Sequence, residues 1–105
     1  MAGEHAQLSL RRTGGLAGLP MVASLDTREL DTEEAAAISA ALDEVDLAHV
    51  GEGPPAAPGA ADMLHYDLEI RRGDRSDTVS FGERQMPPEL APVIRTLMRR
   101  AQPGR

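Results

Sequence analysis

Residues 64–71 alternate strictly between apolar and polar side chains, and this alternation constrains the fold more than any other feature of the sequence. Successive side chains of a strand point to opposite faces of its sheet, so the pattern predicts a strand with one buried face. Gly73 and Asp74 predict a turn, and a partner strand follows with Val79 and Phe81 facing the same way. Strands with one apolar face each indicate an antiparallel sheet that is covered on one side only.

The N-terminal part of the chain predicts a second pair of strands. Leu8 and Leu10 alternate with polar residues over Gln7–Thr13, and Met21–Leu25 alternates in the same way. Between them, the segment Gly14–Leu19 is rich in glycine and carries apolar residues. This connection is longer than a tight turn requires.

Two helices complete the pattern. Asp31 lies three residues before Glu34, a spacing typical of a helix N-cap, and helix one then carries an apolar face made of Ala35, Ile38, Leu42 and Val45. Pro87 and Pro88 predict the start of helix two, because proline is tolerated in a first helical turn. Its apolar stripe consists of Leu90, Val93, Ile94, Leu97 and Met98.

The predicted fold class is therefore α+β. We expect a four-stranded antiparallel sheet with two helices packed on one face, in the order ββαββα, which is an open sandwich. Residues 1–6 are expected to be a disordered N-terminal tail, residues 7–100 a single domain and residues 101–105 a C-terminal tail. Gly51–Ala61 is a Pro/Gly/Ala segment that predicts a loop within the domain.

Composition excludes several classes of function. The chain of 105 residues contains no cysteine, which rules out disulfides, thiolate catalysis and thiolate metal sites. A net charge of −6 and only two aromatic residues, Tyr66 and Phe81, argue against nucleic acid as a partner. No apolar run approaches the roughly 20 residues of a membrane span, and Met1–Gln7 has no apolar signal core. We therefore expect no nucleic-acid or membrane partner and a cytoplasmic location.

The candidates for chemistry are few. The histidines His5, His49 and His65 have no helical spacing to another ligand, so no metal site is predicted and solvent-facing histidines are the simpler interpretation. Asp67 and Glu69 share one strand face and could act as an acid–base pair only within a pocket that separates their pKa values. Alternation places both on the open face, where solvated carboxylates are expected. The sequence predicts no enzyme, no catalytic residue and no cofactor.

The Gly14–Leu19 segment is not a phosphate-binding loop, because it lacks the lysine and the Ser/Thr of that motif and does not lead into a helix. Two arrangements of Leu16 and Leu19 are open. In one, both side chains fold back onto the core; in the other, both project from a glycine-rich recognition loop as apolar anchors.

Four segments together resemble the emfourin family of bacterial protein inhibitors. They are Arg12–Gly18, the Asp31–Val45 helix, Asp62–Leu68 and Met86–Leu90, and the resemblance spans about Gln7 to Arg100. The Thr13–Gly18 stretch is its most specific part. Leu16 departs from the pattern, since an aromatic residue is expected there more often, and this departure affects affinity or target choice if the loop makes contact.

The resemblance implies a function that the residues alone do not name. The chain would inhibit a bacterial zinc metalloprotease of the thermolysin or protealysin type, binding at or over its active-site cleft. Independently of the resemblance, we expect the chain to be a monomer. The catalytic zinc would belong to the target. The protease-contacting residues would be Gly14, Gly15, Leu16, Ala17, Gly18 and Leu19, with the Gly51–Ala61 loop and the open sheet face around His65, Asp67 and Glu69 as weaker candidates.

Two other classes of function stay open. A non-inhibitory protein–protein interaction module with the same fold would bind a partner without affecting peptidase activity. A small-molecule binder or enzyme on the open sheet face would need a concave pocket with convergent polar groups. An edge strand such as Met21–Leu25 could also pair with another chain.

Overall fold

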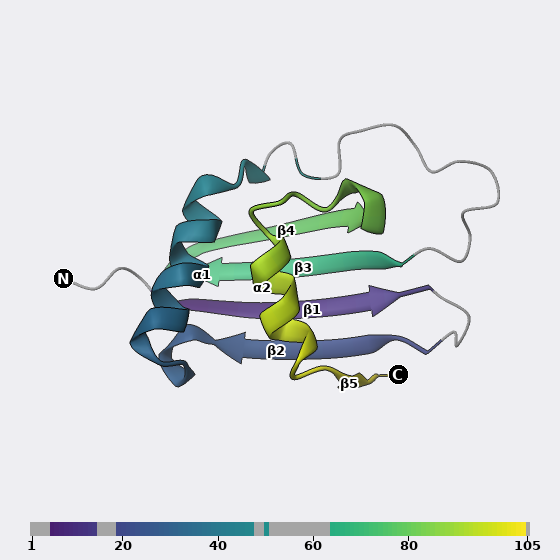
Figure 1. Ribbon diagram of the computed structural model, residues 1–105, viewed down its shortest axis with the longest axis horizontal. Coiled ribbons are helices and arrows are strands. Elements are labelled where there is room, and N and C mark those ends of the chain that lie inside the picture. The colour runs from purple at the N-terminus through teal and green to yellow at the C-terminus, as the bar shows by residue number, and fades with distance from the viewer. Residues whose placement is uncertain (1–4, 15–18, 48–49, 51–63, 105) are drawn as a thin grey trace.

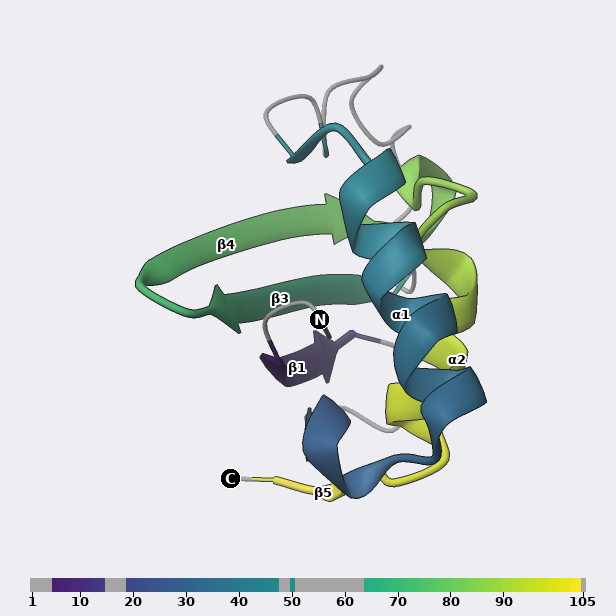
Figure 2. The ribbon, with the colours of Figure 1, turned by 90° about the vertical axis from the view of Figure 1, so that its left-hand side faces the viewer.

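The computed structural model describes residues 5–14, 19–47, 50 and 64–104. It is an open sandwich: one antiparallel sheet carries both helices on the same face, as Figures 1 and 2 show from two directions. The prediction of an α+β fold with one covered sheet face is confirmed.

The sheet has five strands in the order β4-β3-β1-β2-β5. They are β1 (Ala6–Thr13), β2 (Met21–Asp26), β3 (His65–Arg72), β4 (Arg75–Gly82) and β5 (Gln102–Pro103). The first strand therefore lies in the middle, between β2 from its own hairpin and β3 from the second hairpin. The turn between β3 and β4 contains Gly73, whose φ of 58° suits a residue without a Cβ.

Helix α1 (Thr32–Glu44) begins where the sequence predicts. The Asp31 side chain accepts a hydrogen bond of 2.8 Å from the Glu34 N–H, which satisfies one of the free donors of the first turn. Ile38, Leu42 and Val45 are buried against the sheet. A short 3-10 helix, η1 (Thr27–Glu29), links β2 to this helix.

Helix α2 (Ala91–Met98) begins later than the predicted Pro87–Pro88. Single turns precede it, in which the carbonyls of Pro87 and Pro88 accept hydrogen bonds from Leu90 and Ala91. Proline still occupies the first helical turn, as Pro92. Another 3-10 helix, η4 (Glu83–Gln85), leads from β4 towards α2.

The core lies between the sheet and the helices. It is built almost entirely from aliphatic residues, and its two aromatic rings, Tyr66 and Phe81, stack with centroids 5.5 Å apart. The largest side chains that are fully buried are Phe81, Leu8, Leu68, Ile70, Leu90, Leu97 and Val93.

The predicted count of four strands is wrong by one. Gln102 and Pro103, which the sequence placed in a C-terminal tail, pair with Val22 and Met21 as β5. The Gly104 N–H donates a hydrogen bond of 2.8 Å to the Pro20 carbonyl and extends this contact. Two residues are too short to show an alternating pattern, so nothing in the sequence distinguished them from a tail.

Candidate functional site

The ends of the β1–β2 connection lie at the end of the sheet opposite α1 (Figure 1). Gly14 follows β1 with a φ of 90°, a conformation that residues with a Cβ rarely adopt. Leu19, just before β2, is 61% exposed and is the one large apolar residue with an exposed side chain in the described part of the chain. Leu19 therefore does not fold back onto the core.

Several predicted site residues lie outside the described residues. They are Gly15, Leu16, Ala17 and Gly18 of the connection, together with His49 and the segment Gly51–Ala61. The structure thus brings Gly14 and Leu19 to one end of the sheet and leaves the residues between them as sequence predictions.

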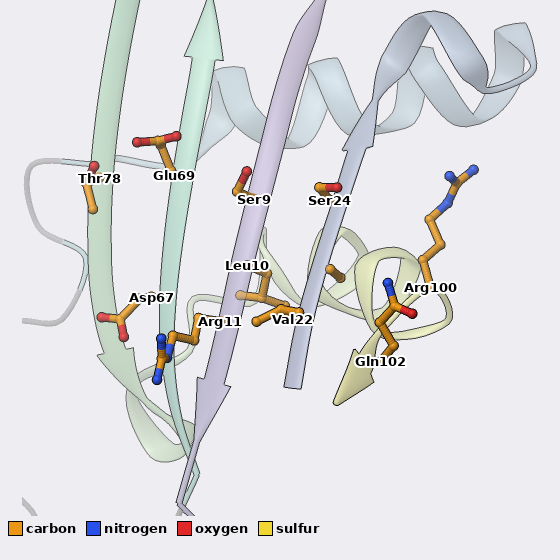
Figure 3. Close-up of a pocket in the computed structure, with 11 residues that line it drawn as sticks. Ser9, Leu10, Arg11, Val22, Ser24, Asp67, Glu69, Thr78, Arg100 and Gln102 are labelled. Carbon is orange, nitrogen blue, oxygen red and sulfur yellow. The ribbon is translucent and has the colours of Figure 1, made fainter. Parts of the chain in front are cut away.

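The face of the sheet that the helices leave uncovered is polar and shallowly hollowed. Its hollow has a volume of about 670 Å³ and lies mainly over β1, β2 and β3. Figure 3 shows one row of side chains crossing four strands here, in the pairing order Thr78, Glu69, Ser9 and Ser24. Such a surface offers hydroxyl and carboxylate groups to a partner without enclosing a small molecule.

A second row contains Asp67, one of the charged residues that the sequence singled out. Asp67 pairs in register with Arg11 on one side and with Ser80 on the other. The Ser80 hydroxyl donates a hydrogen bond of 2.6 Å to Asp67 Oδ1, and His65 Nε2 lies 3.5 Å from the same oxygen. Asp67 is thus held by its neighbours on an open surface, which supports the interpretation of this face as a solvated contact surface.

Glu69 belongs to the other row, where it pairs in register with Ser9 and Thr78. The two residues lie two positions apart on β3, and each has its own cross-strand partners. The arrangement lacks the burial that an acid–base pair requires.

A cluster at the other end of the sheet has a strongly perturbed carboxyl group. Arg28 donates to Asp26 through both its guanidinium group, at 2.7 Å, and its backbone N–H, at 2.9 Å. These hydrogen bonds, with a weaker one from the Gln7 side chain, hold the pKa of the Asp26 carboxyl well below its usual range. The same pairing raises the pKa of the Arg28 guanidinium. The cluster fixes the junction between β2 and η1.

The described residues form neither a metal-binding cluster nor a membrane-spanning helix. Among residues 5–14, 19–47, 50 and 64–104, no three His, Asp or Glu side chains gather in a way that would hold a metal ion. No helix in this part of the chain has the length and apolarity to cross a membrane.

Sequence reasoning missed the contributions of Arg11, Ser9 and Ser24 to the open face. The alternation predicted that these residues lie on the polar face of a strand, but which residues lie beside them depends on the order of the strands in the sheet. It also missed Arg100 and Gln102, which border the hollow because the chain returns to β2 after α2.

Fold and surface together define a small α+β domain with a one-sided sheet, a polar open face and an apolar residue exposed at one end of its first hairpin. The emfourin family model matches residues 10–98, and the chain belongs to the emfourin family. Comparisons with curated proteins and with solved structures give no significant match. The family is one of inhibitors rather than of enzymes, which is consistent with the prediction that this chain is not an enzyme.

Proposed function

We propose that this protein inhibits a bacterial zinc metalloprotease of the thermolysin or protealysin type by binding at or over its active-site cleft. The observation that carries the proposal is the match of residues 10–98 to the emfourin family. In this proposal residues 7–100 are the inhibitory domain, the protein acts as a cytoplasmic monomer, and it contributes neither metal nor catalytic group.

The contact is proposed to involve the connection Gly14–Leu19. Leu19 supports this choice, because its side chain is 61% exposed although most large apolar residues of the chain are buried. When an exposed apolar residue contacts a partner, its surface loses water, and the binding free energy becomes more favourable in proportion to the apolar area that is buried. A glycine with φ of 90° at position 14 lets the backbone turn sharply as it leaves β1.

The pairing of the strands at the base of the connection supports the same choice. An inhibitor that occupies a protease cleft must avoid being cleaved, and a connection between two paired strands has its ends fixed. Arg12 and Met21 pair across β1 and β2 at the base of the connection. The open sheet face around His65, Asp67 and Glu69 is a further candidate contact, supported by the polar hollow that Asp67 and Glu69 line.

A non-inhibitory binding module is the alternative function. The open face favours it, because Ser9, Glu69 and Thr78 offer hydroxyl and carboxylate groups with which a partner can form hydrogen bonds. In that case the domain would bind a partner and leave peptidase activity unchanged.

The deciding experiment is a titration of a purified thermolysin-type metalloprotease with this protein, followed by peptide hydrolysis over time after different periods of preincubation. Stoichiometric loss of activity supports the inhibitor. Full activity at a large excess of folded protein, across several such enzymes, favours the binding module.

A further inference from the structure

The short strand β5 lies beside β2, towards the end of the sheet at which the β1–β2 connection lies (Figure 1). Together with Gly104 it forms the β5 segment, residues 102–104, which runs antiparallel to the start of β2. The Gly104 N–H donates a hydrogen bond of 2.8 Å to the carbonyl of Pro20, the residue that follows Leu19. The family model matches residues 10–98, so the β5 segment lies outside the matched part of the chain.

The hydrogen-bond pattern of the β5 segment accommodates its proline. In an antiparallel pair of strands, hydrogen-bonded and non-bonded positions alternate. Because Gly104 is bonded, the next bonded position is Gln102, which lies opposite Val22. Pro103 lies between these two positions, where no N–H is needed. The segment is therefore held to β2 at both of its ends.

Close packing also holds the β5 segment in place. A Cβ added at Gly104 would lie 2.7 Å from Val22 Cγ1, well inside the roughly 3.5–4.0 Å at which two carbon atoms pack best. Before the segment, Ala101 packs against the core, and its N–H donates a hydrogen bond of 3.2 Å to the Met98 carbonyl. The chain that leaves α2 is thus anchored before it reaches β2.

Pro20 transmits the position of the β5 segment to Leu19. The β1–β2 ladder ends at the pair of Arg12 and Met21, one residue short of Pro20. The proline ring fixes φ of Pro20 at about −65° and restricts the residue before it to extended conformations. A hydrogen bond that holds the Pro20 carbonyl therefore narrows the directions in which Leu19 can point.

We propose that the β5 segment positions the protease contact: it holds Pro20 and so presents the exposed Leu19 in the conformation that binds. This inference rests on the proposed inhibition and assigns a role in it to residues outside the contact itself. The physical gain is preorganisation, because a residue that is ordered before binding loses less conformational freedom on binding. Gly104 is the central positioning residue, since both its N–H and its lack of a Cβ are used.

The first test removes the hydrogen bond. Gly104→Pro lacks the N–H that Pro20 accepts, and because β5 is exposed the melting temperature should stay close to that of the parent. The inhibition constant for a thermolysin-type metalloprotease should rise about 3- to 10-fold. Leu30→Ala is the matched control, because Leu30 packs against the core and its replacement should lower the melting temperature without changing the inhibition constant.

The outcomes separate this inference from the proposed function. A parent chain that inhibits, with an unchanged inhibition constant in Gly104→Pro, would overturn the positioning role alone. A parent chain that does not inhibit would overturn the proposed function and the positioning role with it.

A double-mutant cycle tests whether the β5 segment acts through Leu19. Once alanine replaces Leu19, the direction of this side chain no longer matters. Gly104→Pro should then raise the inhibition constant by less than about twofold in the Leu19→Ala background. The same increase in both backgrounds would mean that the β5 segment contacts the protease itself or acts elsewhere, and would overturn the positioning role.

A second cycle tests the packing of Gly104 on Val22. Gly104→Ala keeps the N–H but adds a Cβ, so it should raise the inhibition constant in the parent chain. It should lose most of this effect in the Val22→Ala background, where Cγ1 is absent. An equal effect in both backgrounds would refute the role assigned to Gly104.

Amide exchange tests the geometry without a protease. In the free parent chain, the Gly104 N–H should exchange more slowly than in the chain unfolded by denaturant, because the Pro20 carbonyl accepts it. Equal exchange rates would show that this hydrogen bond does not hold Pro20 and would overturn the inference.

Discussion

Replacing Leu19 with alanine should weaken inhibition without weakening the fold. Complete burial of a leucine side chain is worth about 1.5–3 kcal/mol. Leu19 is 61% exposed, so transfer of its exposed part into a protease cleft would be worth about 1–2 kcal/mol. Alanine retains only the Cβ, so most of this free energy is lost, and the inhibition constant should rise about 5- to 30-fold.

The assay is the progress-curve titration of a thermolysin-type metalloprotease, with the melting temperature measured on the same samples. Because Leu19 contributes little to the core, its replacement should change the free energy of unfolding by less than about 0.5 kcal/mol. Leu30→Ala is the matched control. Leu30 is half-buried, packs against the core and lies next to α1, at the other end of the sheet.

The two leucine variants should give opposite results. Leu30→Ala should lower stability by about 1–2 kcal/mol and leave the inhibition constant unchanged. An unchanged inhibition constant for Leu19→Ala, in a protein that inhibits, would show that this residue is outside the contact. The open sheet face would then become the leading candidate.

Three further substitutions test the fold. Thr27→Val removes the buried Oγ1 that accepts a 3.0 Å hydrogen bond from the Ala6 N–H; urea unfolding should show a loss of about 1–3 kcal/mol, and parent-like stability would contradict this role. The pKa of Asp26 is lowered in the folded state by hydrogen bonds from Arg28, so the ionised form stabilises the fold fully above about pH 5 and progressively less as the pH falls below the ordinary aspartate value of about 3.9. Melting temperature should therefore depend less on pH in Asp26→Asn over that acidic range, and an identical pH profile would refute the assignment. Phe81→Ala should cost about 3–5 kcal/mol in denaturant unfolding, because Phe81 is only 1% exposed, and a loss under 1 kcal/mol would mean that the core readily collapses around the gap.

Local patterns predicted the elements of this fold well. Alternation over residues 64–71 specified a strand with one buried face, and the Asp31 cap specified where α1 begins. Both signals act within a few residues, so the sequence contains them directly. The start of α2 was predicted too early, because Pro87 and Pro88 suit isolated turns as well as a first helical turn.

Local sequence patterns could not predict which strands pair with one another over long distances in the chain. The position of β1 between β2 and β3 determines that Arg11 lies beside Asp67, and no local pattern contains that register. The fifth strand depends on where the chain travels after α2. The predicted contact segment Gly14–Leu19 can be compared with the structure only at its two ends, because the structure describes Gly14 and Leu19 but not the residues between them.

The central place of β1 also has a consequence for how the chain folds. Its partners in one hairpin are close in sequence, but Ala6 pairs with Arg72 and Thr13 with His65. During synthesis, one side of β1 has no partner until β3 has left the ribosome. Closing such a distant contact costs more chain entropy than forming either hairpin. We therefore expect that formation of the β1–β3 ladder, rather than of either hairpin, limits the rate of folding.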